Sequence, residues 1–352
     1  MPLRSLLMAV VLTLALTACL PSASPSPGSS AGPSSTVSGS LAGELRQVRL
    51  LLGFRPDVQF APFYLAQQEG FFADAGLEVT IEHADAGELI RLVADGQAEF
   101  GVADATDVLI ARTSGIPIKY VSTLYQFFPV ALIGPAGEVP SDPADLAGLR
   151  IGTPGRFGSS WHALLALLDA GGLTVDDVAI REYPQFNQVE GLLNGDVDLI
   201  TGFRNNEPLR LAAQGMDTDL LTVDDIAPLP GPGIIVSDEL LANDLNLVNH
   251  VAGATLQAQL AIAHEPEIGL RAAVVAVPTI AEDEATALAV LEATIAIWGE
   301  AGSGINGVIN EPVWRSGYQI MLDLGFIDGS VPVDDMFDVQ VYGRVRLTVS
   351  RR

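Results

Sequence analysis

The segment VRLLLGFRPDVQFAPFYLAQQEGFFADAGLEVTIEHA, residues 48–84, decides the fold class. Its apolar start (48–54) predicts a buried strand, and its end (77–84) alternates between apolar and polar residues as a second strand does. Between them, residues 62–76 carry apolar side chains at helical spacing, and Gly76 is placed to end the helix. The alternation of strands and helices continues to residue 125, which favours an α/β fold with a largely parallel sheet.

A second block of the same kind follows along the chain. Strands are predicted at RIGTP (150–154), VAIREYP (178–184) and VDLITGF (197–203), with helices between them. The Pro/Gly cluster APLPGPG (227–233) closes this block, and the remaining third of the chain is mostly helical in its periodicity. The restart of the pattern predicts a second sheet.

The two blocks predict an α/β fold of two lobes, each a largely parallel sheet flanked by helices. Ligands bind at the C-terminal ends of strands in open α/β sheets, so the ligand cleft is expected between the lobes. Because the helical tail is expected to return to the first block, lobe 1 is discontinuous and comprises residues 46–132 plus 234–352. Lobe 2 is expected over residues 133–233.

The N-terminus predicts export and lipid anchoring. Arg4 precedes a short apolar run that is followed by Leu16-Thr17-Ala18-Cys19, so residues 1–18 are expected to be a signal peptide. Cys19 is the chain's single cysteine, and its setting resembles a bacterial lipobox, in which the thiol and the new amine carry fatty chains. Residues 19–45, rich in Ser, Pro and Gly, predict a flexible tether on the extracytoplasmic side of the cell membrane.

Charge and residue types exclude several partners. The formal net charge is −25, which repels nucleic acid and anionic lipid headgroups, so membrane contact is expected through the lipid anchor only. The four histidines show no metal-ligand spacing, and no nucleophile motif or phosphate-binding loop occurs. We therefore expect no metal, no cofactor and no catalysis.

Five stretches along the chain carry a family resemblance. They are FAPFYLAQQEGFFADAGLEVTI (60–81), LVADGQAEFGVADATDVLIARTSGIPIKYVSTLYQ (92–126), DLAGLRIGTPGRFGSS (145–160), GLLNGDVDLITGFRNNEP (191–208) and GINGVINEPVWRSGYQIMLDLGFID (304–328). Together they resemble the periplasmic binding proteins (type II fold) for thiamine pyrimidine precursors, riboflavin, alkanesulfonates and nitrate. The resemblance implies a two-lobed binding protein that serves a membrane permease and an ATPase of an ABC importer.

One branch of that family is enzymatic and builds the thiamine pyrimidine with iron and a cysteine-rich motif. The chain has a single cysteine, at position 19, so that branch is not expected. Two further alternatives stay open at this point: an extracellular enzyme on the same scaffold and an extracellular sensory ligand-binding module.

Candidate ligand contacts in lobe 1 lie where predicted strands end. Phe60 and Tyr64 follow the first strand, and their rings can stack on a flat ligand, although packing explains them equally well. Asp104 and Thr106 begin a helix after AEFGVAD (98–104), where Asp104 also serves as an N-cap residue. Gln126 and Phe127 lie near the first crossing between the lobes.

The loop GRFGSSW (155–161) is the most informative candidate in lobe 2. A glycine-rich turn into a helix presents free N–H groups and hydroxyls, which suit an anion or a carbonyl-rich ring. Side-chain amides and a carboxylate follow the strand VDLITGF, and they can form hydrogen bonds with the N–H and C=O groups at the edge of a ring. The lobe 2 candidates are Gly158, Ser159, Ser160, Trp161, Tyr183, Asn187, Phe203, Asn205 and Glu207.

The aromatic candidates favour a flat heteroaromatic solute, riboflavin or a thiamine pyrimidine precursor. A small anion, such as an alkanesulfonate or nitrate, is the alternative. It would prefer positive charge, and only Arg55, Arg156 and Arg204 are placed to supply it. The chain is expected to be a monomeric solute-binding component of an importer.

Overall fold

The structure is a computed structural model, and it describes residues 44–299 and 304–341. The predicted signal peptide, Cys19 and most of the tether lie outside the described residues. Among the residues that are described, no helix combines the length and the apolar character needed to cross a bilayer.

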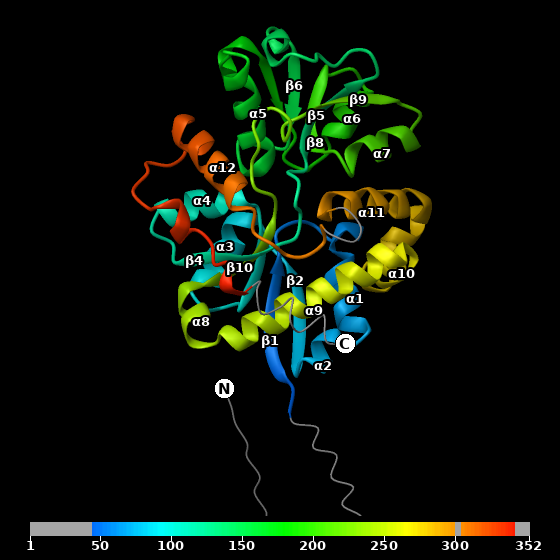
Figure 1. The fold of residues 1–352 in the computed structure, drawn as a ribbon. Helices are drawn as coiled ribbons and strands as arrows, with labels where there is room; N and C mark the ends of the chain where they lie inside the picture. Colours follow the sequence, from blue (N-terminus) through cyan, green and yellow to red (C-terminus); the bar gives the residue numbers. More distant parts are fainter. Residues whose placement is uncertain (1–43, 300–303, 342–352) are drawn as a thin grey trace, which may run out of the picture. The chain divides into compact units, whose positions relative to one another are not determined.

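The first sheet has the strand order β2-β1-β3-β10-β4 (Figure 1). Its strands are β1 (Arg46–Leu52), β2 (Leu77–His83), β3 (Phe100–Ala103), β4 (Ile118–Thr123) and β10 (Gly233–Ser237). Strand β1 runs parallel to β2 and β3, whereas β10 runs antiparallel to β3 and β4. The parallel strands therefore bring the loops that follow β1, β2 and β3 to one edge of the sheet.

The second sheet has the order β7-β6-β8-β5-β9. Its strands are β5 (Val130–Pro135), β6 (Arg150–Thr153), β7 (Ala179–Glu182), β8 (Leu199–Phe203) and β9 (Thr218–Thr222). Strand β6 is parallel to β7 and β8, and β5 is antiparallel to β8 and β9. The predicted pair of α/β units is confirmed, but the sheets are mixed, because β5 and β10, the strands that follow the two crossings, run against their neighbours.

The chain passes between the sheets twice. It leaves the first sheet after Thr123 and enters the second at Val130, then returns between Thr222 and Gly233. The expected boundary between residues 132 and 133 therefore falls inside β5, and Gly233 already belongs to the first sheet. Sequence periodicity misplaced these points because the apolar run of a strand gives no sign of which sheet it joins.

Both faces of the first sheet are covered by helices. Alternate residues of β1 point to opposite faces, so Leu50 and Leu52 lie in one apolar cluster and Leu51 in another. The helices that surround this sheet are α1 (Ala61–Gln68), α2 (Phe71–Asp74), α3 (Ala86–Ala94), α4 (Ala105–Thr113), α8 (Asp238–Asn243), α9 (Leu245–His264), α10 (Pro266–Ala276), α11 (Glu284–Trp298) and α12 (Glu311–Asp323). Burial on both faces explains why β1 ends in the apolar run Leu50–Leu52.

The predicted helix over residues 62–76 is wrong as a single element. Helix α1 ends at Gln68, and α2 begins at Phe71 after Gly70, whose φ is +75°. A left-handed residue cannot continue a right-handed helix, and glycine adopts that conformation at no steric cost. The apolar spacing continues through the break, which is why periodicity alone missed it.

The second sheet packs against three helices, α5 (Gly158–Ala170), α6 (Gln188–Leu193) and α7 (Glu207–Ala213). Short 3-10 turns complete the described chain at Val58–Phe60, Pro143–Leu146, Val175–Asp177, Pro278–Asp283 and Val333–Asp335. Helix α12 contributes to both cores. Its Trp314 packs against Tyr120 of β4 at 4.9 Å between ring centroids, whereas Ile320 packs against the apolar cluster of the second sheet.

Candidate functional site

Loops from the ends of strands in the two sheets contact each other directly. Phe54, Asp57 and Gln59 follow β1, and Asp104 follows β3. Across from them, Ser159 lies in the first turn of α5, Phe186 follows β7, and Asn205 and Arg210 follow β8. We call these eight residues the strand-end site.

A buried polar group forms the centre of the strand-end site. Asn205 is 1% exposed, and its Nδ2 donates to Gln59 Oε1 at 2.7 Å and to Thr294 Oγ1 at 2.7 Å. The Tyr125 hydroxyl donates to the same Gln59 oxygen at 3.4 Å. Among the described residues, Asn205 Oδ1 is buried with no hydrogen-bond partner. An unpaired buried acceptor is costly, so this oxygen is suited to a donor from a bound molecule.

Asp57 links the first turn after β1 to helix α7. Its buried carboxylate accepts the Gln59 backbone N–H at 3.1 Å, as an N-cap does, and the Gln59 side-chain amide at 3.2 Å. Arg210 Nη2 lies 2.9 Å from the same carboxylate. The charge that Asp57 carries into this interface is therefore paired by a cation from the second sheet's helix.

Aromatic rings gather around the loop that follows β1. The Tyr64 hydroxyl lies 3.1 Å from His83 Nε2, and His83 Nδ1 lies 2.6 Å from the Phe54 carbonyl. Burial lowers the pKa of His83, so the ring is neutral, donates from Nδ1 and accepts from Tyr64. Phe60 packs edge-on against His83 with 5.4 Å between centroids.

The ring of Phe54 meets the ring of Phe186 from the second sheet edge-on, with 5.2 Å between centroids. Phe186 has a φ of +57°, the left-handed region that a bulky residue rarely occupies. Backbone in this region costs free energy and persists only where the surroundings impose it. The conformation brings an aromatic side chain to the contact between the two sheets.

Two carboxyl groups face the start of α5. Asp104 Oδ2 accepts the Ser159 backbone N–H at 3.3 Å, and Asp107, one turn further along α4, lies 4.0 Å from His162 Nδ1. Burial raises the pKa of Asp107 to about 8, assisted by the nearby Asp104 charge. Burial also raises the pKa of Asp104, and hydrogen bonds from Ser159 oppose the rise. The Asp104 side chain thus leaves its own helix uncapped and reaches the other sheet's helix.

Glu207 begins α7 as predicted, and its carboxylate folds back toward β8. It accepts the Phe203 backbone N–H at 2.7 Å and lies against Gly202, where a Cβ would approach Glu207 Cγ to 2.8 Å. Burial raises the pKa of Glu207 to about 7. The Phe203 ring packs against the apolar clusters of both sheets, so these two residues secure the strand end that presents Asn205.

Four sequence candidates are packed in cores, among them Tyr64, which is 3% exposed in the apolar cluster that α1 forms with the first sheet. Trp161 belongs to the apolar cluster between the second sheet and α5, and Thr106 is fully buried in α4. The Tyr183 ring covers Gly191 so closely that a Cβ there would lie 2.1 Å from the hydroxyl. Tyr183 was expected to line the cleft, but β7 directs its ring into the second sheet's core.

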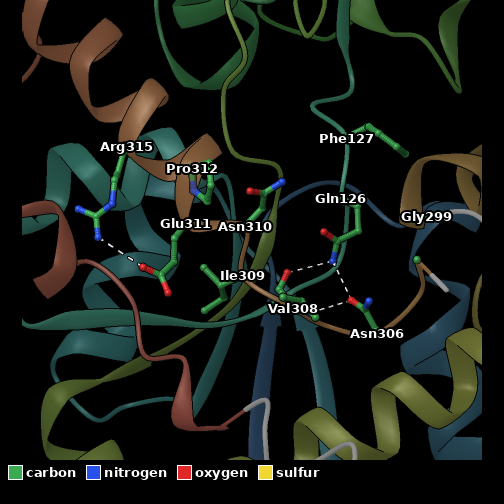
Figure 2. Close-up of a pocket in the computed structure, with 11 residues that line it drawn as sticks. Gln126, Phe127, Gly299, Asn306, Val308, Ile309, Asn310, Glu311, Pro312 and Arg315 are labelled. Atoms are coloured by element: carbon green, nitrogen blue, oxygen red, sulfur yellow. Dashed lines mark hydrogen bonds and ion pairs between the residues drawn. The ribbon is translucent and has the colours of Figure 1, made fainter.

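Gln126 and Phe127 lie in the first crossing and face a different cavity, which Figure 2 shows. Gln126 Nε2 donates to the Val308 carbonyl at 3.0 Å and to Asn306 Oδ1 at 3.3 Å. The cavity has a volume of about 700 Å³ and is formed with residues of the segment 304–315. The sequence placed these two candidates near the first crossing, where the structure has them, and they line this cavity together with the segment 304–315.

The remaining candidates lie at helix starts. Gly158 is the first residue of α5 with a φ of +66°, Ser160 is half-buried beside it, and Asn187 is exposed before α6. The sequence interpretation missed Phe54, Asp57, Gln59, Phe186, Arg210 and Thr294. Thr294 gave one usable signal, a polar residue inside the apolar run of α11. Within the ranges that are described, no three His, Cys, Asp or Glu side chains gather as metal ligands do.

Comparison with known proteins finds relatives over more than half of the chain. The riboflavin-binding protein RibY of Chloroflexus aurantiacus is 37% identical over 216 residues, which are 60% of this chain and 61% of that protein. A formylaminopyrimidine-binding protein of Halalkalibacterium halodurans is 26% identical over 55% of this chain and 59% of its own length. A 4-amino-5-hydroxymethyl-2-methylpyrimidine phosphate synthase of Uromyces fabae is 28% identical over 52% and 55%. The chain thus spans 55–61% of the length of these relatives.

The fold is shared more widely than the sequence. The periplasmic aliphatic sulphonate-binding protein SsuA of Escherichia coli superposes with a TM-score of 0.65 at 12% identity, over 83% of this chain and 92% of that one. This likeness confirms the predicted periplasmic-binding-protein fold. The family described as NMT1/THI5 like matches residues 57–268, and the chain belongs to that family.

Proposed function

We propose that the protein captures a small solute at the strand-end site, between a lobe built on each sheet. Asn205 carries this proposal. It is a buried side chain from the second sheet that bonds to Gln59 of the first and keeps one acceptor unpaired. Residues from both sheets must approach each other to enclose a molecule there, and a solute that contacts both stabilises the closed form.

The proposed solute is a flat heteroaromatic vitamin or vitamin precursor. Four phenylalanines lie in the loops that follow β1, β6 and β7: Phe54, Phe60, Phe157 and Phe186. Phe157 leaves 56% of its surface exposed, which is unusual for a ring and leaves a face available for stacking. The riboflavin-binding relative supports riboflavin, and the formylaminopyrimidine-binding relative supports a pyrimidine.

The site residues that we propose combine sequence candidates with residues found in the structure. Phe60, Tyr64, Asp104, Ser159 and Asn205 are retained from the sequence, and Glu207 positions the loop that carries Asn205. Phe54, Gln59 and Phe186 are added.

Delivery to an importer completes the proposed role. We infer that residues 46–129 and 233–341 form one lobe and residues 130–222 the other, that the lobes hinge at the two crossings, and that a membrane permease with its ATPase receives the solute. Anchoring through Cys19 would keep the protein at the extracytoplasmic face of the cell membrane. The Cys19 anchor is tested by mass spectrometry of the protein from its native host, which must detect fatty chains on that residue.

Catalysis is not part of the proposed function. The family resemblance implies that the enzymatic branch uses a cysteine-rich motif, and Cys19 is the single cysteine of this chain. Asp104 and Glu207, two carboxyls near the strand ends, are both occupied as acceptors of backbone N–H groups.

Thermal unfolding with candidate solutes tests the proposed function. A ligand that binds the folded state at 100 times its Kd stabilises it by about 2.7 kcal/mol, which raises the melting temperature by several degrees. Riboflavin or an aminopyrimidine is expected to raise the melting temperature, whereas an alkanesulfonate is not. A shift with sulfonates alone would contradict the heteroaromatic assignment.

A further inference from the structure

A buried chain of hydrogen bonds fixes which way the carboxamide of Asn205 points. It starts at the Asp57 carboxylate, an acceptor, which holds the Gln59 side-chain amide by its Nε2 group at 3.2 Å. Gln59 therefore presents its oxygen to Asn205, whose Nδ2 lies 2.7 Å from it. The opposite orientation of either amide would set two oxygens against each other. The order of donors and acceptors thus runs in one direction, from Asp57 to Asn205.

Thr294 fixes the same carboxamide from a second side. Its hydroxyl donates to the Val290 carbonyl, one turn earlier in α11, at 2.6 Å, so its oxygen is left to accept. Asn205 Nδ2 donates to that oxygen at 2.7 Å. Both hydrogens of the Nδ2 group are therefore used, one by Gln59 and one by Thr294. The remaining atom of the amide, Oδ1, is buried and has no hydrogen-bond partner among the described residues.

This orientation of Asn205 depends on contact between the two sheets. Gln59 follows β1, Thr294 belongs to α11, which packs in an apolar cluster of the first sheet, and Asn205 follows β8 of the second. When the lobes separate, water can hydrate the carboxamide on every side. The acceptor is thus oriented and dehydrated only in the closed form, so a donor on the solute would favour closure.

From this arrangement we propose that Asn205 Oδ1 selects solutes that carry an N–H donor at the edge of the ring, an imide or an amine, and that Gln59 and Thr294 are positioning residues for it. A site built to accept a hydrogen bond rejects an analogue without the donor, because its own buried acceptor is then left unpaired. A sulfonate group or nitrate offers oxygen acceptors only, so neither can supply this bond. The selectivity rests on the proposed function, because it concerns the same site.

Riboflavin and 3-methylriboflavin form the direct test, because methylation replaces the N–H of the flavin ring without changing its charge. Flavin fluorescence reports binding of both compounds to the purified protein, to Asn205→Leu and to Asn246→Leu. Leucine has the branched shape of asparagine but no acceptor, so Asn205→Leu separates hydrogen bonding from a steric effect of the methyl group. Asn246, exposed on α9, is the matched control. The corresponding pyrimidine pair is 4-amino-5-hydroxymethyl-2-methylpyrimidine and its 4-dimethylamino analogue, followed by calorimetry.

The expected result is a preference for the N–H member of the pair by about 100-fold or more in the unmodified protein and in Asn246→Leu. Asn205→Leu is expected to narrow this ratio at least about tenfold, by losing affinity for the N–H member alone. Circular dichroism melts of each variant verify folding. Thr294→Val should narrow the ratio by a smaller factor, because Gln59 still holds the amide, and Thr294→Ser, which keeps the hydroxyl, should restore the ratio.

The outcomes, read on whichever pair binds, separate the two proposals. Equal binding of the N–H member and its methylated analogue by the unmodified protein overturns the donor selectivity and leaves solute capture intact. An Asn205→Leu ratio within about twofold of the unmodified protein overturns the role of Asn205, because the methyl group then acts by its size. If no member of either pair binds to the folded, unmodified protein, the heteroaromatic function itself is contradicted, and the donor selectivity with it.

Discussion

Arg210 reaches across from α7 to place its Nη2 2.9 Å from the carboxylate of Asp57, a residue 153 positions earlier in the chain. The carboxylate is buried, whereas 40% of the Arg210 side chain is exposed. The pair thus joins the loop after β1 to the helix after β8.

Removal of the Arg210 cation should destabilise the protein. Arg210→Gln leaves the Asp57 carboxylate buried without its cation. Breaking a fully buried pair costs about 3–5 kcal/mol, and the half-exposed guanidinium reduces the expected loss to about 1–2 kcal/mol. Urea unfolding measures this free energy. Arg271→Gln is the control, because its pair with Glu265 is exposed on both sides and should change stability by less than about 0.5 kcal/mol. Equal losses of stability in the two variants would show that the Arg210–Asp57 pair contributes no more to the free energy of unfolding than an exposed ion pair.

Truncation of Asn205 should weaken solute binding more than it weakens the fold. Asn205→Ala removes the bond to Gln59 and the unpaired buried acceptor, and we expect riboflavin or pyrimidine affinity to fall about 10- to 100-fold. Fluorescence or calorimetric titration measures the affinity. Asn246→Ala, at an exposed position of α9, should leave it unchanged. An unaltered Kd for a folded Asn205→Ala protein would place the solute elsewhere.

Glu207 should give the protein a pH-dependent stability. Its pKa is raised to about 7 by burial, so between its unfolded value and pH 7 the folded state holds a proton that the unfolded state has lost. The stability contribution is therefore complete below the unfolded pKa and declines as the pH rises toward 7 and above. Glu207→Gln keeps an acceptor for the Phe203 N–H but has no carboxyl group to titrate. Between pH 5 and 8 its free energy of unfolding should therefore fall by on the order of 1–2 kcal/mol less than that of the unmodified protein. Identical pH profiles for the two proteins in thermal unfolding would refute the raised pKa.

Replacing Gly70, at the break between α1 and α2, and Gly87, inside α3, by alanine should change stability in opposite directions. Both glycines have open space where a Cβ would lie. Gly70→Ala places a side chain at a φ of +75° and should cost about 1 kcal/mol. Gly87→Ala lies in α3 with no positive φ and should be neutral or stabilising by up to about 1 kcal/mol. Chemical denaturation of both variants checks the sign. Stabilisation by Gly70→Ala would mean that residues 61–74 form one continuous helix after all.

Much of the fold could be predicted from the sequence because the periodicity of apolar residues reports burial directly. Both faces of β1 are covered, so 48–52 is almost uniformly apolar and is readily recognised as a strand. The antiparallel courses of β5 and β10 could not be predicted in this way, since direction within a sheet depends on where the chain crosses and leaves no mark on hydropathy. The break at Gly70 was missed for a related reason, because apolar spacing runs through it.

The candidate site was predictable in its location and less so in its residues. Strand ends pointed to Asp104, Ser159 and Asn205, and the structure places all three in contact with the opposite sheet's loops; that they contact a ligand stays a prediction. The partners of these residues could not be predicted from local patterns because they are distant in sequence. Gln59, for example, lies 146 residues from Asn205. Tyr183 shows the opposite error, since a strand-end aromatic residue looks the same in sequence whether its ring faces the other lobe or covers Gly191.

Hydrogen–deuterium exchange with saturating riboflavin, repeated with an aminopyrimidine, tests the central claim most directly. We predict that backbone amides exchange more slowly in three loops simultaneously, those after β1 (53–60), β6 (154–160) and β8 (203–207). One molecule held between the sheets would order all three loops. Protection confined to a single sheet, or found only around Gln126 and residues 304–315, would contradict capture at the strand-end site.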